Sequence, residues 1–164
     1  MKTVEFIPFL LSEKADIFSI RLDGKEQTET EEFLIEFKNT DSKPLKMDLD
    51  SILLSLKGIS NVGVLESFFR PEGKFSDRIC AIPLLTTPRN KSVFGTLRLY
   101  CIRVSDKLLI LGNGGEKKSR TYEEDPSLAE KVRVLQQIDK VLSELEDGGR
   151  DIHSEIYNLT LQIA

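Results

Sequence analysis

The spacing of hydrophobic residues changes along the chain, and each change marks a different kind of predicted element. Two apolar, β-prone runs near the N-terminus, VEFIPFLL and DIFSIRL, predict two short strands, and the second ends at Asp23-Gly24, a dipeptide that favours a tight turn. Hydrophobic residues then recur at helical spacing over 29–38, directly after Thr28 and Glu31, which form a capping-box pattern. This segment is predicted to be a short helix.

Two longer helices are predicted further along the chain. We expect Lys43-Pro44 to break the chain and Asp48 to cap the second helix, which should end near 61–63. Its apolar residues recur at helical spacing: Leu49, Ile52, Leu53, Leu56 and Ile59. The third helix has Asp125-Pro126 as its expected cap and first position, and the Gly148-Gly149 pair should end it.

Between the second and third helices the period of the pattern falls to two, as expected for β-strands. Three runs, residues 78–86, 96–104 and 107–111, predict an antiparallel meander. In the middle run, Arg98 and Tyr100 should share one face of the sheet because alternate residues of a strand point the same way. After the third helix the chain has apolar residues at roughly helical spacing, and its LTLQI segment fits an edge strand equally well.

The composition fits one soluble domain. The chain has 164 residues, of which 40% are hydrophobic and 30% charged, and a chain of this length buries roughly two-thirds of its unfolded surface. No apolar run approaches the roughly 20 residues of a membrane-spanning helix, and no segment resembles a signal peptide. We therefore expect a cytoplasmic protein with no membrane partner. Cys80 and Cys101 lack metal-ligand spacing and are expected to be reduced and buried, with a disulfide as the alternative.

Charge is distributed unevenly along the chain. The net charge is −4, yet residues 67–122 contain eleven Lys and Arg against four acidic residues, a balance of +7, which leaves −11 for the remainder. A basic centre on an acidic body is typical of a face that binds a polyanion, because local potential rather than net charge attracts a charged partner. The alternative interpretation is chance clustering of ordinary surface lysines.

The candidate chemistry gathers where the meander ends. Residues 95–122, GTLRLYCIRVSDKLLILGNGGEKKSRTY, pass through a glycine-rich run into Lys117, Lys118, Arg120 and Tyr122. Cations neutralise a phosphodiester, and a phenol stacks on a base or donates a proton. The competing interpretation is that the lysines are solvated charges at the end of a strand and that Tyr122 packs against a helix.

Two other features of the sequence give weaker indications. The run 112–115, Gly-Asn-Gly-Gly, matches neither of the glycine-rich nucleotide-binding motifs, so we do not expect a nucleotide site there. The single histidine, His153, has no recognisable catalytic partner beside it in the sequence and is expected to be a surface residue. We expect neither a metal nor another cofactor.

The order of these elements resembles the RelE/HigB superfamily of bacterial type II toxins, in particular its HigB-like, phage-derived branch. That branch has an acidic residue and an arginine on the first meander strand, an arginine-plus-aromatic strand, an apolar strand and a KK-x-polar-T exit; this chain has Asp77 with Arg78, LRLYCIRV, LLIL and KKSRTY. The resemblance implies a single α+β domain over 1–164 with an antiparallel sheet packed by helices. Its core would span 28–145, preceded by a β extension over 1–27 and followed by a tail over 149–164.

The resemblance also implies a function. Members of the superfamily are toxin components that cut mRNA, often on the ribosome, as metal-independent endoribonucleases, and a helix-turn-helix antitoxin holds them silent. The implied catalytic residues are Arg98 as phosphate clamp, Lys117 and Lys118 as electrostatic stabilisers or base, Arg120 as second clamp, and Tyr122 as stacking group or proton donor. The implied RNA-binding residues are Arg78, Tyr100 and Arg103, although pairing of Arg78 with Asp77 or another acid would make it structural.

Two further functions remain open from the sequence. The chain is either the toxin, or a non-catalytic relative that holds a protein or nucleic acid, or a toxin of the ParE branch that inhibits DNA gyrase. Intact folding without nuclease activity would favour the second, and gyrase inhibition without RNA cleavage would favour the third. Self-association of the chain is also left open.

Overall fold

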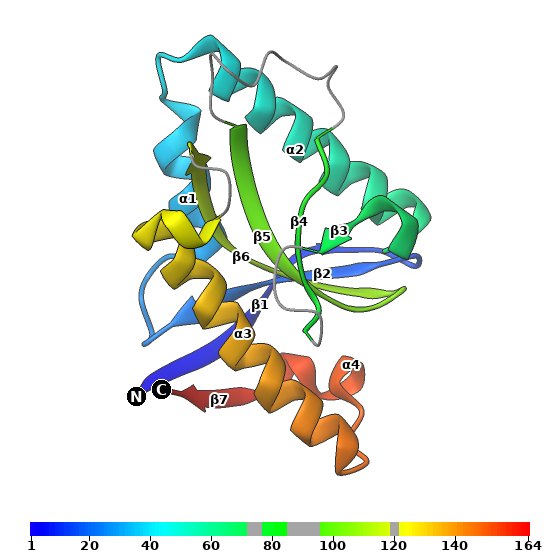
Figure 1. The fold of residues 1–164 in the computed structure, drawn as a ribbon. Coiled ribbons are helices and arrows are strands. Elements are labelled where there is room, and N and C mark those ends of the chain that lie inside the picture. The colour runs from blue at the N-terminus through cyan, green and yellow to red at the C-terminus, as the bar shows by residue number, and fades with distance from the viewer. Residues whose placement is uncertain (72–76, 85–95, 119–121) are drawn as a thin grey trace.

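The computed structural model describes residues 1–71, 77–84, 96–118 and 122–164, with the side chains of residues 70 and 71 left out. Its strands form one sheet with the order β3-β4-β5-β6-β2-β1-β7 (Figure 1). The strands are β1 (Lys2–Leu11), β2 (Asp16–Leu22), β3 (Arg70–Pro71), β4 (Ile79–Ala81), β5 (Thr96–Ser105), β6 (Leu108–Lys117) and β7 (Thr160–Ile163). The helices are α1 (Glu29–Lys38), α2 (Lys43–Val62), α3 (Pro126–Asp147) and α4 (Ile152–Glu155), with short 3₁₀ turns η1 (Glu66–Phe68), η2 (Tyr122–Glu124) and η3 (Ile156–Asn158).

The α+β class is confirmed, but the sheet is mixed rather than antiparallel throughout. The predicted meander is present, because β4 pairs antiparallel with β5 and β5 antiparallel with β6. On its other edge β6 pairs with β2 in parallel, with Phe18 opposite Ile110. A parallel pair needs a long crossover connection, and the chain between β2 and β6, which includes both α1 and α2, provides it. The N-terminal hairpin is thereby joined directly to the meander.

Helices cover both faces of the sheet, and the sheet separates the interior into two cores (Figure 1). The predicted alternation of the middle strand is present in β5. Tyr100 and Ile102 belong to the core beneath α3, whereas Leu97, Leu99 and Cys101 belong to the core beneath α1 and α2. Because side chains alternate across a strand, one strand contributes to both cores.

The first and third helices begin where their capping residues predicted. The hydroxyl of Thr28 accepts a hydrogen bond from the Glu31 amide at 3.1 Å, and the Glu31 carboxylate accepts one from the Thr28 amide at 2.9 Å, so the capping box is complete. The carboxylate of Asp125 caps α3 through the amides of Ser127 and Leu128. α3 ends at Gly148, as predicted.

The predicted start of the second helix was wrong. α2 begins at Lys43 with Ser42 as its cap, and Pro44 lies in the first turn, where a proline has no hydrogen bond to lose. Asp48 is therefore not a cap. It lies inside α2, is 1% exposed, and its carboxylate accepts a hydrogen bond from the Leu97 amide at 3.0 Å, at the start of β5. The end of α2 at Gly63, with φ of 111°, agrees with the prediction.

The outer strands of the meander differ in length from their predictions. β4 covers only residues 79–81 of the predicted 78–86, of which 85 and 86 lie outside the described residues. β6 continues to Lys117, so the glycine-rich run is part of a strand rather than an exit loop. Side chains would not fit there: a Cβ at Gly112 would lie 2.9 Å from Leu135 of α3, and one at Gly114 would lie 1.8 Å from the carbonyl oxygen of Arg98. The glycines allow neighbouring elements to approach β6 closely.

The tail combines both structures that its sequence allowed. Its first part forms α4 and η3, and its LTLQI segment forms β7, which pairs antiparallel with β1 at the edge of the sheet. Cys80 and Cys101 are free and buried, as predicted, and face each other across β4 and β5. Among the described residues, no helix has the length and apolar character needed to cross a membrane.

Candidate functional site

The pairing of β5 with β6 places Arg98 and Lys117 on the same face of the sheet. Arg98 lies opposite Gly115, and Lys117 lies two residues further along β6, opposite Thr96. A Cβ at Gly115 would lie 3.1 Å from Leu128 of α3, so this face is the one that α3 covers. Residues two apart in a strand share a face, so Arg98 and Lys117 are diagonal neighbours. With Lys118 and Tyr122 they form what we call the basic corner, where β5 begins and β6 ends (Figure 1).

Buried polar contacts hold the two strands of the basic corner in place. The Asp48 carboxylate of α2 accepts a hydrogen bond from the amide of Leu97, the residue that precedes Arg98. On β6, the Lys131 ammonium of α3 donates to the Gly114 carbonyl at 2.5 Å. The Arg98 guanidinium is half-buried and makes a long hydrogen bond, 3.5 Å, to the Leu97 carbonyl. The backbone that carries the cations is thus fixed from both faces of the sheet.

The aromatic residues of the corner are part of the core. Tyr100 is 0% exposed, so its side chain offers no surface to a ligand, and its burial does not support the RNA-binding role that the resemblance implied for it. Tyr122 is partly buried and packs against the same core, with its ring centroid 6.3 Å from that of Tyr100 in an edge-to-face arrangement. Its position agrees with the interpretation of Tyr122 as a packing residue.

The two lysines at the end of β6 differ in their surroundings. Lys117 is half-buried and forms no ion pair with any residue that the structure describes. Lys118 is 74% exposed, and its ammonium lies 3.8 Å from the Glu116 carboxylate, a contact that water screens strongly. Arg120, the second clamp implied by the resemblance, lies outside the described residues.

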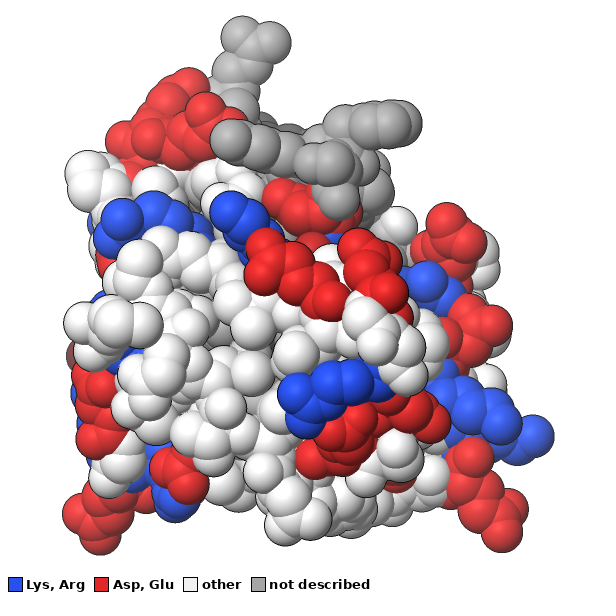
Figure 2. Space-filling view, turned by 90° about the horizontal axis from the view of Figure 1, so that it is seen from below, with Lys and Arg blue, Asp and Glu red and all other residues white. Residues whose placement is uncertain are grey.

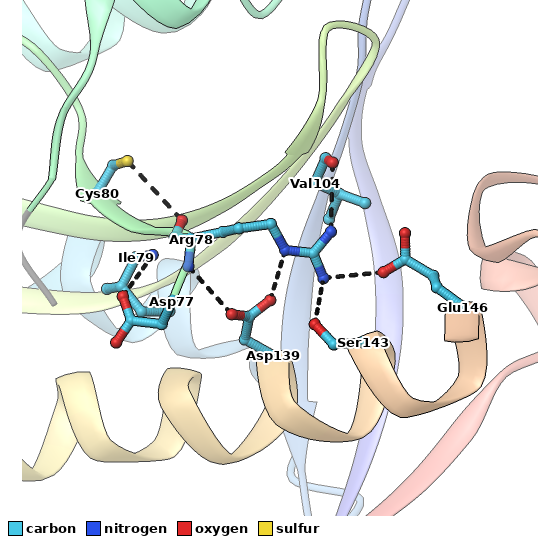
Figure 3. A network of polar contacts seen from close by, with 8 residues as sticks. All are labelled: Asp77, Arg78, Ile79, Cys80, Val104, Asp139, Ser143 and Glu146. Carbon is cyan, nitrogen blue, oxygen red and sulfur yellow. Dashed lines mark hydrogen bonds and ion pairs between the residues drawn. The ribbon is translucent and has the colours of Figure 1, made fainter. Parts of the chain in front are cut away.

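Arg78 is held in a structural network rather than offered to a ligand (Figure 3). Its guanidinium donates to Asp139 at 2.8 Å, to Glu146 at 2.9 Å and to the Ser143 hydroxyl at 3.2 Å, all on α3. Burial acts to lower the pKa of Arg78, but Glu146 and Asp139 outweigh it and raise the pKa above its usual value. The RNA-binding role implied for Arg78 is therefore not supported by its contacts: another acid pairs with it, as the sequence had allowed.

Arg103 is engaged in the same way on the other face of the meander. Its Nε donates to the Val64 carbonyl at 3.0 Å, and a terminal nitrogen pairs with Asp106 in the β5–β6 turn. Arg103 lies near the end of β5, whereas Arg98 lies near its start. Arg103 is therefore away from the basic corner, and its contacts do not support the RNA-binding role that the resemblance implied for it. Arg103 instead ties the hairpin to the chain that follows α2.

These contacts reduce the basic segment 67–122 to a smaller candidate surface. The side chains of five of its eleven cations lie outside the described residues: Arg70, Lys74, Arg89, Lys91 and Arg120. Two more, Arg78 and Arg103, are held in the contacts just described, and Lys107 lies in the distant hairpin turn. The cations left at the basic corner are Arg98, Lys117 and Lys118.

The end of the molecule that contains β7 and α4 has a different surface. Seen from that end, positive and negative side chains lie next to one another around a broad uncharged area, and the described residues form no continuous basic patch there (Figure 2). Among the described residues, no group of three or more His, Cys, Asp or Glu side chains is arranged to hold a metal ion. The basic corner is therefore the better candidate for binding a polyanion.

The histidine has a partner that the sequence did not indicate. Nε2 of His153, in α4, lies 2.8 Å from a carboxylate oxygen of Asp16 at the start of β2, and Tyr157 packs edge-to-face on Phe18 of the same strand. The two members of the His–Asp pair are 137 residues apart in the chain, so no local motif could reveal it. The pair attaches the tail to the sheet and lies away from the basic corner.

Comparison with known proteins gives no relative: no family, no curated protein and no solved structure matches this chain.

Proposed function

We propose that this chain is a RelE/HigB-like toxin that cleaves mRNA at the basic corner without a metal ion and is silenced by a helix-turn-helix antitoxin. The observation that carries the proposal is the strand register, which puts Arg98 and Lys117 on one face of the sheet beside Tyr122. The element order on which the resemblance rests also supports it, because two helices precede an antiparallel meander and a third helix follows.

The chemistry assigned to the corner is charge stabilisation. In metal-free cleavage, the RNA 2′-hydroxyl gives its proton to water and its oxygen attacks the phosphorus. The bond from phosphorus to the 5′-oxygen breaks, the 5′-oxygen takes up a proton from water, and a 2′,3′-cyclic phosphate and a 5′-hydroxyl are left. Negative charge builds on the non-bridging oxygens, and fixed cations stabilise it most effectively. We assign this role to Arg98 and Lys117, contact with a neighbouring phosphate to Lys118, and a second clamp to Arg120. The ring of Tyr122 packs on Tyr100, so we assign Tyr122 to the scaffold of the corner.

The test compares the wild-type chain with a Lys117→Ala, Lys118→Ala, Arg120→Ala variant after induction in bacteria. The matched control replaces two exposed lysines of α2, Lys46→Ala with Lys57→Ala. The wild type and the control should arrest growth and fragment transcripts, and the corner variant should do neither while remaining folded. In vitro, cleavage should persist in a metal chelator and leave 2′,3′-cyclic phosphate ends. The corner variant should cleave RNA about a hundredfold more slowly than the wild type, or slower still.

Other outcomes would identify the alternatives. If the folded wild type binds RNA through the corner but leaves it whole, the chain is a non-catalytic relative of the toxins. The chain's single histidine is bound to Asp16 and lies away from the corner, so it does not supply a general base there. If induction instead inhibits DNA gyrase and spares RNA, the cations of the corner are incidental and the proposed function is overturned.

A further inference from the structure

A separate cavity lies between the first turn of α1 and the first half of α3, over β2 and β6. Its volume is about 270 Å³. Ile20, Leu22 and Val134 provide apolar lining, and Asn113 of β6 provides an uncharged polar side chain. The other lining residues are Lys2, Lys25, Glu29, Glu32, Ser127, Glu130 and Lys131. An apolar lining with a few polar groups is typical of a site for a small ligand.

Most charged groups around this cavity are already paired. The Lys131 ammonium donates to the Gly114 carbonyl, and the Lys2 ammonium lies 3.8 Å from the Glu130 carboxylate. Glu130 also pairs with Arg133 on α3. The cavity therefore does not present an unpaired ammonium group from Lys131 that would select an anionic ligand.

Glu29 is the most buried of the acids that line this cavity, and its only ion pair among the described residues is long. Its side chain is only 13% exposed, and its Oε2 atom is buried and accepts no hydrogen bond from any described residue. The nearest cation, the Lys25 ammonium, is 3.9 Å from that oxygen and half exposed to water, so it compensates the carboxylate weakly. Burial raises the pKa of Glu29, and the Glu32 carboxylate adds to the rise, while Lys25 and the Asn113 amide act against it. The buried Oε2 atom has only the distant, half-exposed Lys25 ammonium near it, and a ligand with N–H groups would supply the hydrogen bond that this oxygen lacks.

The position of Glu29 is fixed by neighbours that do not depend on a ligand. Thr30, the next residue, donates to the Gly112 carbonyl of β6 at 2.8 Å and accepts from the Ser19 hydroxyl of β2 at 2.6 Å. The capping box at Thr28 fixes the start of the helix on the other side. The carboxylate is thus held at the cavity by a preformed backbone, which lowers the entropic cost of binding.

We propose that this cavity binds a small organic cation, a primary ammonium or guanidinium group on a short apolar stem, which donates hydrogen bonds to Glu29. The stem would lie against Ile20, Leu22 and Val134. The cation is either a free small molecule or a basic side chain of a protein partner; both present the same chemistry. A metal ion is not the occupant we infer, because the described residues offer no group of three ligands.

The test titrates the full chain with the N-acetyl amides of arginine, lysine and citrulline by calorimetry. Acetylcitrulline amide has nearly the shape of acetylarginine amide but no charge, so only the two cations should bind saturably with one site. Glu29→Gln should weaken their affinity about tenfold to a hundredfold, the range of one charge-assisted hydrogen bond. Glu36→Gln, an exposed acid on the same helix, should not change it.

A second variant separates loss of binding from loss of folding. Ser127→Phe fills the cavity from an exposed position on α3 without changing any charge, and it should abolish binding while the thermal unfolding midpoint stays near that of the wild type. An acetylated Gly-Arg-Gly amide that binds as well as acetylarginine amide identifies a protein side chain as the source, and preference for unacetylated arginine amide identifies a small molecule. Absence of saturable binding, equal binding of acetylcitrulline amide, or unchanged affinity in Glu29→Gln would overturn the proposal.

Discussion

Single residues of β6 determine how closely the elements of the basic corner approach one another. Gly114 is the tightest position, because a Cβ there would lie 1.8 Å from the Arg98 carbonyl oxygen, well inside van der Waals contact. The atom in the way is backbone, so no side-chain rotation relieves the clash. Gly114 is therefore required by the strand that carries Arg98 and not by a nucleotide.

Gly114→Ala should lower the free energy of unfolding by at least about 2 kcal/mol, as overpacking against fixed backbone does. Urea denaturation measures the change. Gly58→Ala is the matched control: a Cβ there meets nothing within 4 Å, and alanine is a better helix former, so this variant should gain about 0.5–1 kcal/mol. Equal effects of the two substitutions would show that close packing at Gly114 is not what the chain requires.

At the scale of elements, the ion network of Arg78 attaches the start of β4 to α3. Arg78 contributes both its backbone amide and its guanidinium to Asp139, which has a side chain only 5% exposed. Since α3 also packs on β6 and carries Lys131, this network helps to fix the helix that covers the basic corner. The role of Arg78 is thus indirect: it holds the scaffold of the site.

Arg78→Ala should destabilise the protein by about 3 kcal/mol, because removing one partner of a buried ion pair leaves the other charge uncompensated. Arg133→Ala serves as control on the same helix; its pair with Glu130 is exposed, so its loss should cost less than about 1 kcal/mol. Chemical denaturation of both variants measures the difference. If Arg78→Ala retains wild-type stability but loses RNA binding, Arg78 belongs to the ligand surface after all.

At the scale of the whole molecule, an acidic body must approach an acidic polymer through one positive region. The net charge is −4, and the positive balance is confined to residues 67–122. Binding of single-stranded RNA by the basic corner should therefore weaken steeply with salt. Each phosphate neutralised contributes about 0.7 to the slope of log affinity against log salt concentration, so the three described cations together predict a slope of about −2.

Filter binding or fluorescence anisotropy across a salt series measures this slope. Lys117→Ala should weaken binding and make the slope shallower by about 0.7, since one phosphate contact is lost. As a control, Lys57→Ala replaces an exposed lysine of α2 and should leave both the affinity and the slope unchanged. Affinity that does not vary with salt would contradict binding through the basic corner.

Local patterns in the sequence determined the elements whose causes are themselves local. The capping box at Thr28, the cap at Asp125 and the alternation of 97–102 predicted α1, α3 and the two faces of β5, because caps and side-chain periods depend on residues a few positions apart. The cation at Arg98 and those at the end of β6 were also found from the sequence.

The tertiary structure alone decided the remainder, since it depends on partners far apart in the chain. The sequence predicted Asp48 to be a helix cap, but its carboxylate accepts a hydrogen bond from the Leu97 amide of β5. Arg78 is removed from the candidate surface by acids more than 60 residues away, and the cavity beside Glu29 is lined by residues of β6 and α3 that are distant in the chain. Pairing and burial arise from the packing of whole elements, which no short window of sequence contains.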